Sequence, residues 1–184
     1  SDVYKRQALD ANTTADNNTA VGFCSLSTNT TGAENVAVGI CTLSANTTGA
    51  INTAVGAGAL KSNTTGTANV AVGCDALDSN TTGVENTIVG REAGCSNTTG
   101  NCNTALGLRS LKSNTEGNGN IAIGYHALCT NTTGSVNLAM GFCAMQSNLT
   151  GTSNTAIGAN ALETNTTGTD TVSYTHLRAH ETES

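Results

Sequence analysis

Apolar and polar residues alternate over short stretches of the chain, and the same pattern returns every 17 residues. In the segment NVAVG at 35–39, two valines flank a central alanine, which is the period-2 signature of a β-strand. A shorter apolar step follows at 42–43, and the run SANTTG at 44–49 has the Ser, Asn, Thr and Gly composition of a turn. Each unit therefore predicts one five-residue strand, a bend at glycine, a short second extended segment and a turn.

Asparagine and glycine occupy fixed positions in the unit, which reads NTTGxxNTAVGxxALxS. One asparagine opens the turn and recurs from Asn12 to Asn165, and a glycine follows it by three residues from Gly32 to Gly168. A second asparagine, expected to form a structural ladder, recurs at Asn18, Asn35, Asn52, Asn69, Asn86, Asn103, Asn120, Asn137 and Asn154. The glycine expected to make the structural turn follows it by four residues, at Gly22, Gly39, Gly56, Gly73, Gly90, Gly107, Gly124, Gly141 and Gly158.

A single unit cannot be stable alone. Full burial of Val55 and Leu60 would contribute roughly 1.5–3 kcal/mol each, whereas ordering the backbone costs about 1–2 kcal/mol for every residue. Units must therefore stack in register, about 4.8 Å apart, so that neighbours share burial and backbone hydrogen bonds. Stacking forms asparagine ladders and continuous Val, Leu and Ala columns, with glycine at each bend that needs a positive φ. The chain is thus predicted to be all-β, a parallel β-solenoid (β-roll) of nine to ten coils and roughly 45 Å long.

Composition and charge exclude several classes of partner. The chain has 184 residues, of which 11% are charged and 3% aromatic, and it contains no proline or tryptophan. A net charge of −6 argues against a nucleic-acid partner, which would need a basic stripe. No apolar run approaches the roughly 20 residues of a membrane span, so none is expected in this fragment.

The two ends of the chain break the repeat. Residues 1–7 (SDVYKRQ) and residues 172–182 both resemble translated adaptor DNA from short-read sequencing libraries. We therefore expect one native domain, a β-solenoid at 8–171, which is an internal part of a longer protein. Residues 1–7 and 172–184 are then non-native tails, expected to pack on nothing, and they carry His176, His180 and Tyr4.

The repeat resembles two families of fibrous proteins. Segments such as GNGNIAIGYHAL at 117–128 are similar to the head repeats of YadA-like trimeric autotransporter adhesins. The longer unit, with its added SNTTG turn, is similar to repeats of phage tail-fibre proteins. The resemblance implies a left-handed roll, a homotrimer and a non-enzymatic head or stalk segment of an extracellular, cell-surface or virion attachment fibre. Its partner would be a host surface or glycan receptor.

Catalysis and metal binding are not expected. His126 is the one histidine of the repeat region, at a variable position two residues after a glycine, so we expect an exposed surface residue and neither an enzyme nor a cofactor. Carboxylates such as Asp75, Asp78 and Glu92 fall at different positions of the unit, and the Gly- and Asp-rich repeat of calcium-binding rolls is absent from the sequence.

The seven cysteines fit no zinc motif, and small apolar fillers are the favoured interpretation. Cys24 and Cys41 share a position on adjacent coils, so a disulfide is permitted by distance. Most turns also match the N-glycosylation acceptor. In NTEG at 114–117 the acceptor threonine is lost but Asn114 is kept, which favours a structural asparagine.

A variable position directly after each strand glycine carries large apolar residues. Because such residues suggest a contact between subunits, we predict one there, with partial burial under the neighbouring turn as the alternative. The residues are Phe23, Ile40, Leu108, Tyr125 and Phe142.

A second function, an ice- or carbohydrate-binding solenoid that uses its threonine rows, is the alternative to a fibre. An ice face would need a regular outward Thr-x-Thr array. Here Thr30 and Thr31 are adjacent, and strand threonines alternate irregularly with valines, which weakens this alternative.

Overall fold

The computed structural model describes residues 7–174 of the chain. Ten strands of three residues each form one parallel sheet, in which neighbours in sequence are also neighbours in space. No helix occurs within the described range. The strands are β1 (Thr19–Val21), β2 (Val36–Val38), β3 (Thr53–Val55), β4 (Val70–Val72), β5 (Thr87–Val89), β6 (Thr104–Leu106), β7 (Ile121–Ile123), β8 (Leu138–Met140), β9 (Thr155–Ile157) and β10 (Val172–Tyr174).

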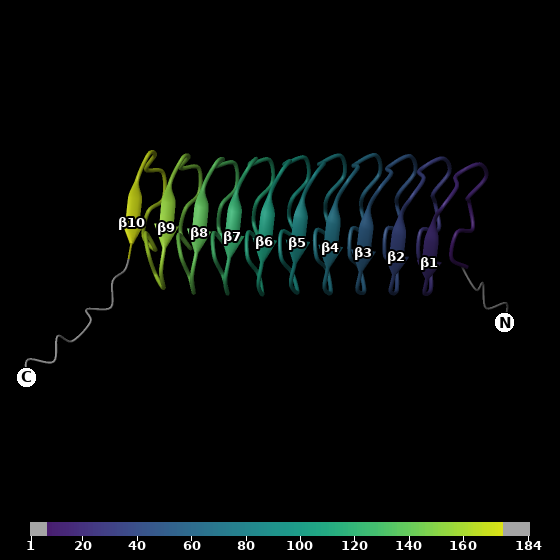
Figure 1. Cartoon of the computed structure of the whole chain (residues 1–184), viewed down its shortest axis with the longest axis horizontal. Helices are drawn as coiled ribbons and strands as arrows, with labels where there is room; N and C mark the ends of the chain where they lie inside the picture. Colours follow the sequence, from purple (N-terminus) through teal and green to yellow (C-terminus); the bar gives the residue numbers. More distant parts are fainter. Residues whose placement is uncertain (1–6, 175–184) are drawn as a thin grey trace, which may run out of the picture.

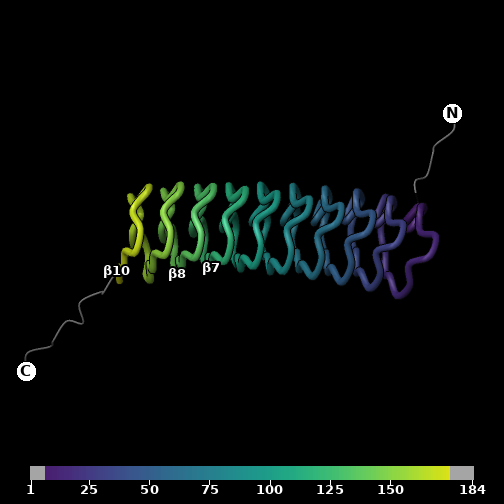
Figure 2. Tube along the Cα trace, turned by 90° about the horizontal axis from the view of Figure 1, so that it is seen from above, coloured from purple at the N-terminus to yellow at the C-terminus, as the bar shows by residue number. Residues whose placement is uncertain are grey.

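Consecutive strands pair in register at a spacing of 17 residues, so that Val36 lies opposite Thr53 and Ala37 opposite Ala54. Between two strands the chain makes one circuit of the rod, and the coils follow one another from the N- to the C-terminal end (Figure 1, Figure 2). The predicted all-β parallel solenoid of 17-residue coils is confirmed, with about nine turns. The left-handed sense stays a prediction.

The second segment of each coil is not extended, so that part of the prediction is wrong. The second and fourth residues after the strand glycine have left-handed backbone angles, as at Cys41 (φ 55°) and Leu43 (φ 50°). These reversals curl the chain so that Leu43 is fully buried. Left-handed angles cost a non-glycine residue roughly 1–2 kcal/mol. Bonds to the adjacent coil offset that cost, since Leu43 N–H donates to Ala59 O at 3.1 Å.

Glycine is needed at two positions of each coil for different reasons. All nine strand glycines have φ between 118° and 142°, which confirms the predicted bends. At Gly39 (φ 141°) a Cβ would also lie 2.7 Å from the carbonyl carbon of Gly56. The turn glycines lack a positive φ, but at Gly66 a Cβ would lie 2.5 Å from Gly83 O. Close approach of neighbouring coils therefore excludes a side chain at Gly66, whereas the first coil carries Ala15 at the equivalent position.

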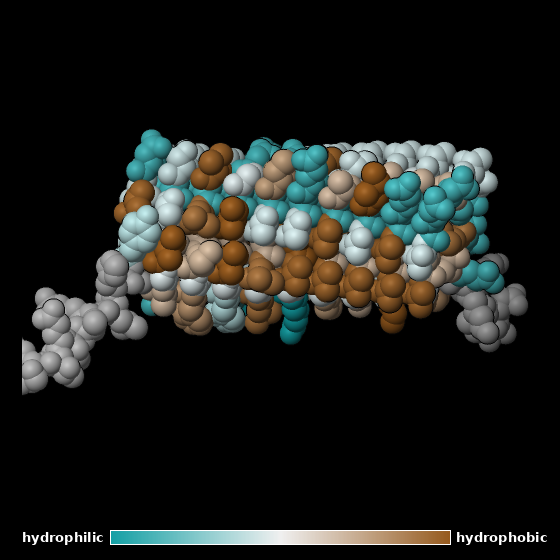
Figure 3. All heavy atoms as spheres, viewed as in Figure 1, coloured by the Kyte–Doolittle hydropathy of each residue, from teal (hydrophilic) through white to brown (hydrophobic). Residues whose placement is uncertain are grey.

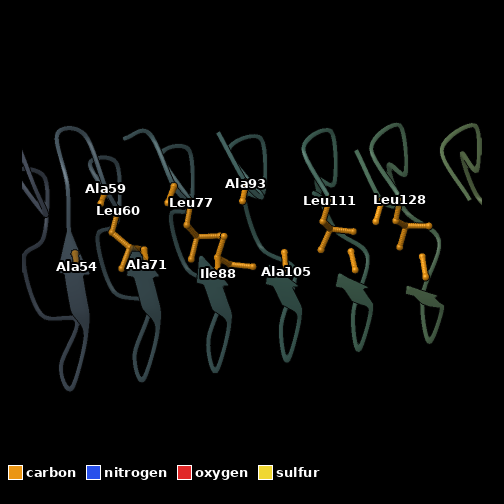
Figure 4. Packing of buried hydrophobic residues seen from close by; sticks show 14 of the residues in the cluster. Ala54, Ala59, Leu60, Ala71, Leu77, Ile88, Ala93, Ala105, Leu111 and Leu128 are labelled. Carbon is orange, nitrogen blue, oxygen red and sulfur yellow. The ribbon is translucent and has the colours of Figure 1, made fainter. Parts of the chain in front are cut away.

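The core is a thin column of alanine and leucine. Strand residue Ala54 and turn residues Ala59 and Leu60 are fully buried and repeat along the rod (Figure 4). Val55 keeps 37% of its surface exposed, so the predicted valine column lies outside the core. The interior is narrow because the central residue of the strand faces a leucine from the turn of the same coil. That leucine leaves room for only a small side chain at the strand position, which is usually alanine.

One coil exchanges the sizes of its two core residues. In β5 the central strand residue is Ile88 where the other eight complete coils have alanine, and Gly94 stands where leucine or methionine is usual. Ile88 is 1% exposed, and Figure 4 shows it pointing toward Leu77. A Cβ on Gly94 would lie 3.4 Å from Ile88 Cδ1. The isoleucine thus fills the volume that a leucine fills elsewhere.

Two asparagine ladders run along the rod, as predicted. In the strand ladder, Asn52 Nδ2 donates to Asn35 Oδ1 at 3.1 Å and to Gly66 O at 2.9 Å, while its backbone N–H donates to the same Oδ1 at 3.0 Å. In the turn ladder, Asn63 Nδ2 donates to Asn46 Oδ1 at 2.8 Å and to Gly66 O. Both amide hydrogens are used, which makes these buried polar groups tolerable.

The solenoid extends three residues beyond its predicted end. β10 pairs with β9, with Val172 opposite Thr155, so the prediction that residues 172–184 pack on nothing is wrong for 172–174. The edge of β9 offers backbone donors and acceptors that any extended segment can meet. Thr171 N–H also donates to Asn154 Oδ1 at 2.9 Å, which continues the ladder position without asparagine. The other tail residues, 1–6 and 175–184, lie outside the described residues.

Candidate functional site

The outward side of the sheet is the candidate interaction surface. Because the central residue of each strand points into the core, the first and third point out. The third-position side chains form a continuous apolar column in which Leu106 is 49% and Met140 40% exposed. First positions mix threonine with valine, isoleucine and leucine. We call the first- and third-position residues of β1–β10 the sheet face.

A second apolar column borders the sheet face. It consists of the residues after each strand glycine, which we call the bend column: Phe23, Ile40, Ala57, Cys74, Arg91, Leu108, Tyr125, Phe142 and Ala159. Its five predicted contact residues are between 38% and 59% exposed, so a large part of each side chain is open to solvent. Apolar side chains run along the strands in a broad band (Figure 3). Tyr125 and Phe142 stack on successive coils, with ring centroids 5.1 Å apart.

Arg91 interrupts the bend column, and its charge is paired. Glu92 accepts a hydrogen bond from Arg109 Nε at 2.7 Å and lies 3.3 Å from Lys112 Nζ, both on the next coil, and 3.1 Å from Arg91. The Arg109 hydrogen bond is the main reason that the pKa of Glu92 is lowered to about 2. Burial opposes this shift, and the Lys112 hydrogen bond adds to the lowering. The cluster connects the coils of β5 and β6 on the flank of the rod.

His126 is half-buried, so the prediction that it is exposed is wrong. Its ring stacks on Tyr125 with centroids 4.2 Å apart, and Nε2 is buried without a hydrogen-bond partner. Burial lowers the pKa of His126, and Arg109 and Lys112 lower it further. Nε2 therefore lacks the hydrogen-bonded partner that orients a catalytic base.

The cysteines divide between core and surface. Cys129 and Cys143 are buried, as expected of apolar fillers, whereas Cys74 and Cys102 are exposed, so the filler interpretation is wrong for these two. Cys41 is a free thiol, so the structure does not pair it with Cys24. Burial raises the pKa of Cys129. No group of three or more His, Cys, Asp and Glu side chains among the described residues is arranged to hold a metal ion.

The turn residues are committed to the fold. Asn46 is fully buried and its amide donates two hydrogen bonds, which supports a structural asparagine over a sugar acceptor. Thr47 Oγ1 donates to Thr64 O at 3.1 Å, and the same bond recurs in most coils. Part of the hydrogen-bonding capacity of the threonine rows, which the alternative function would need, is thus used within the fold.

Two features of the surface were not predicted. A short third ladder joins Asn101 to Asn118, whose Oδ1 accepts the Asn101 backbone N–H at 2.8 Å, and Ser135 extends it. The second is the outward orientation of the strand valines, which were predicted to form a core column. The sequence contained a signal for this orientation. The first strand position accepts both Val and Thr, which is typical of a surface position, whereas the central position is alanine in nearly every coil, which is typical of a narrow core.

No family model, curated protein or solved structure matches the chain in any of the three comparisons. The class of the molecule is therefore defined by its fold: it is a parallel β-solenoid repeat protein with asparagine ladders. No helix of the described part is long and apolar enough to cross a membrane.

Proposed function

We propose that this chain is a non-enzymatic head or stalk segment of an extracellular or virion attachment fibre, in which three copies associate side by side. The fibre would project or present adhesive groups toward a host surface or glycan receptor. The rod shape and the sequence resemblance to adhesin heads and tail fibres support this proposal. The observation that carries it is the uncovered apolar surface along one side of the rod.

The apolar residues are concentrated there and not scattered. Of the sixteen large hydrophobic side chains that are exposed in the described range, eight belong to the sheet face and five to the bend column. Contiguous exposed apolar patches of this kind mark interaction sites. Because the columns repeat with the same period in every copy, a second copy presents the complementary spacing without any further adaptation. The choice of three copies rests on the resemblance alone.

The alternative, an ice- or carbohydrate-binding solenoid, has less support. The first threonine of most turns donates its hydroxyl hydrogen to the next coil, as Thr64 does to Thr81 O at 3.0 Å. The sheet face, where a flat array would lie, carries valine, isoleucine and methionine between its threonines. A hydroxyl array on this rod would therefore be narrow and incomplete.

Sedimentation equilibrium of the full chain tests the proposal. The 18.4-kDa chain is expected to sediment with three times its mass. Replacing Val55, Leu106 and Met140 by serine should yield monomers, because it removes apolar area from the centre of the contact. A matched control replaces Ile51, Val136 and Leu149, which are exposed but lie off both columns, and should leave the trimer intact. A wild-type monomer at every concentration would refute the trimer and leave the fold unaffected.

A further inference from the structure

The hydrogen bonds of this fold connect adjacent coils and point along the rod. In the coil at 46–62, backbone N–H groups donate forward to the next coil or back to the previous one. The forward bonds are Thr47 to Thr64 O, Thr53 to Asn69 O and Leu60 to Ala76 O, and the backward bonds are Ile51 to Ala33 O, Gly56 to Val38 O and Gly58 to Ile40 O. The amide-to-amide bonds of both asparagine ladders also run along the rod, each from one coil to the previous coil. The bonds within a coil are short-range turns such as Asn63 N–H to Leu60 O at 3.2 Å.

In the coils from Cys41 to Cys143, the polypeptide backbone is the only covalent connection from one coil to the next. The six cysteines from Cys41 to Cys143 are free thiols, so none of them cross-links two coils. The first and last described coils lie at opposite ends of the rod (Figure 1), so tension between the chain ends acts along the axis. Such tension loads all the bonds at one coil boundary in the direction in which they separate. An end coil has one neighbour and an interior coil has two, so the end coil yields first.

We propose that the rod is a force-extensible tether, which releases one 17-residue coil at a time under axial tension and is held most strongly at the boundary between the coils of β5 and β6. A folded coil occupies about 4.8 Å of the axis, and its 17 residues reach about 58 Å when extended. Each released coil therefore adds about 53 Å. A fibre built from such segments lengthens in steps under load before its attachment breaks.

The strong boundary is set by the only inter-coil ion pairs in the described chain. Glu92, in the coil of β5, meets Arg109 at 2.7 Å and Lys112 at 3.3 Å, both in the coil of β6. Separating these coils breaks recurring strand, turn and ladder bonds such as those of the other boundaries, and in addition pulls a carboxylate from two cations. Replacing the Glu92 carboxylate by a neutral group leaves Arg109 and Lys112 as like charges with no carboxylate between them.

Single-molecule pulling of the full chain between handles on its two ends tests the inference. We expect successive increments of about 53 Å, with a higher force where the boundary of β5 and β6 opens. In Glu92→Gln that higher force should fall to the level of the other steps, while Glu116→Gln, an exposed carboxylate outside these ion pairs, should leave the record unchanged. A single all-or-none rupture of the whole rod, or the same high-force step in Glu92→Gln, would overturn it. The test uses one chain and does not depend on the proposed trimer.

Discussion

The paired change of Ile88 and Gly94 gives a sharp test of the core. Ile88→Ala alone restores the usual strand residue but leaves the leucine position empty, so a cavity forms against Leu77. Truncations of this kind cost about 2–5 kcal/mol. Gly94→Leu alone inserts a side chain whose first carbon already lies 3.4 Å from Ile88, and such overpacking costs about 1–3 kcal/mol.

The double variant, Ile88→Ala with Gly94→Leu, recreates the core of the neighbouring coils. Gly94 has φ 53°, and leucines at this position elsewhere have φ from 50° to 57°, so the backbone accepts the new side chain. We expect the double variant to lie within about 1 kcal/mol of the wild type, whereas independent effects would sum to at least about 3 kcal/mol.

Urea unfolding followed by circular dichroism measures all four proteins of this cycle. A double variant as unstable as the sum of the two single variants would show that the two side chains do not share one space. The thin-core description would then be wrong at this coil.

Three further predictions test other parts of the fold. Asn69→Ala should lower the free energy of unfolding by about 1–3 kcal/mol, because it leaves buried amides of the ladder without hydrogen-bond partners. A decrease below about 0.3 kcal/mol would contradict the ladder. Gly66→Ala should destabilise the rod strongly through its clash with the next coil. Gly119→Ala, whose Cβ would meet nothing closer than 3.9 Å, should cost only the roughly 1–2 kcal/mol of its left-handed backbone (φ 64°). Burial raises the pKa of Asp78, so its protonated form favours folding below its ordinary pKa of 3.8, and this contribution is lost as pH rises through the raised value. Asp78→Asn should therefore stabilise the chain at pH 7 by under about 1 kcal/mol and make no difference at pH 3. If the variant and the wild type had the same free energy of unfolding at both pH values, burial of the Asp78 carboxylate would not destabilise the fold.

The coil period and the ladders were predictable because their signals are strict. Asn and Gly keep their positions through the repeat, and few other arrangements than in-register stacking use the same polar residue so regularly. The orientation of the strand was harder to predict. Alternation in NVAVG shows that two faces exist, but it does not say which one is buried, and hydrophobicity favoured the valines. The interior is so narrow that the strand buries its alanine and exposes its valines.

The local backbone of the second segment was beyond sequence reasoning. Left-handed angles are expected of Gly, Asn and Asp, whereas here they fall on Leu43, Cys41 and His126. Contacts between coils impose them, and those contacts are visible only once the stack is formed. The exchange at Ile88 and Gly94, in contrast, was readable, since two departures from the repeat occur together in one unit.

The central claim is that each 17-residue unit is one coil, on which the ladders, the core and the apolar columns all depend. Unfolding of two deletion variants tests it directly. Removing 63–79 brings Asn80 onto the coil of Asn46, so every column continues, and the variant should stay folded and be shorter by about 4.8 Å. Removing only 63–70 takes out one turn and breaks a strand, so polar turn groups enter the leucine column at a cost of a few kcal/mol each. The account predicts a folded first variant and a severely destabilised second one, and equal stability of the two would contradict it.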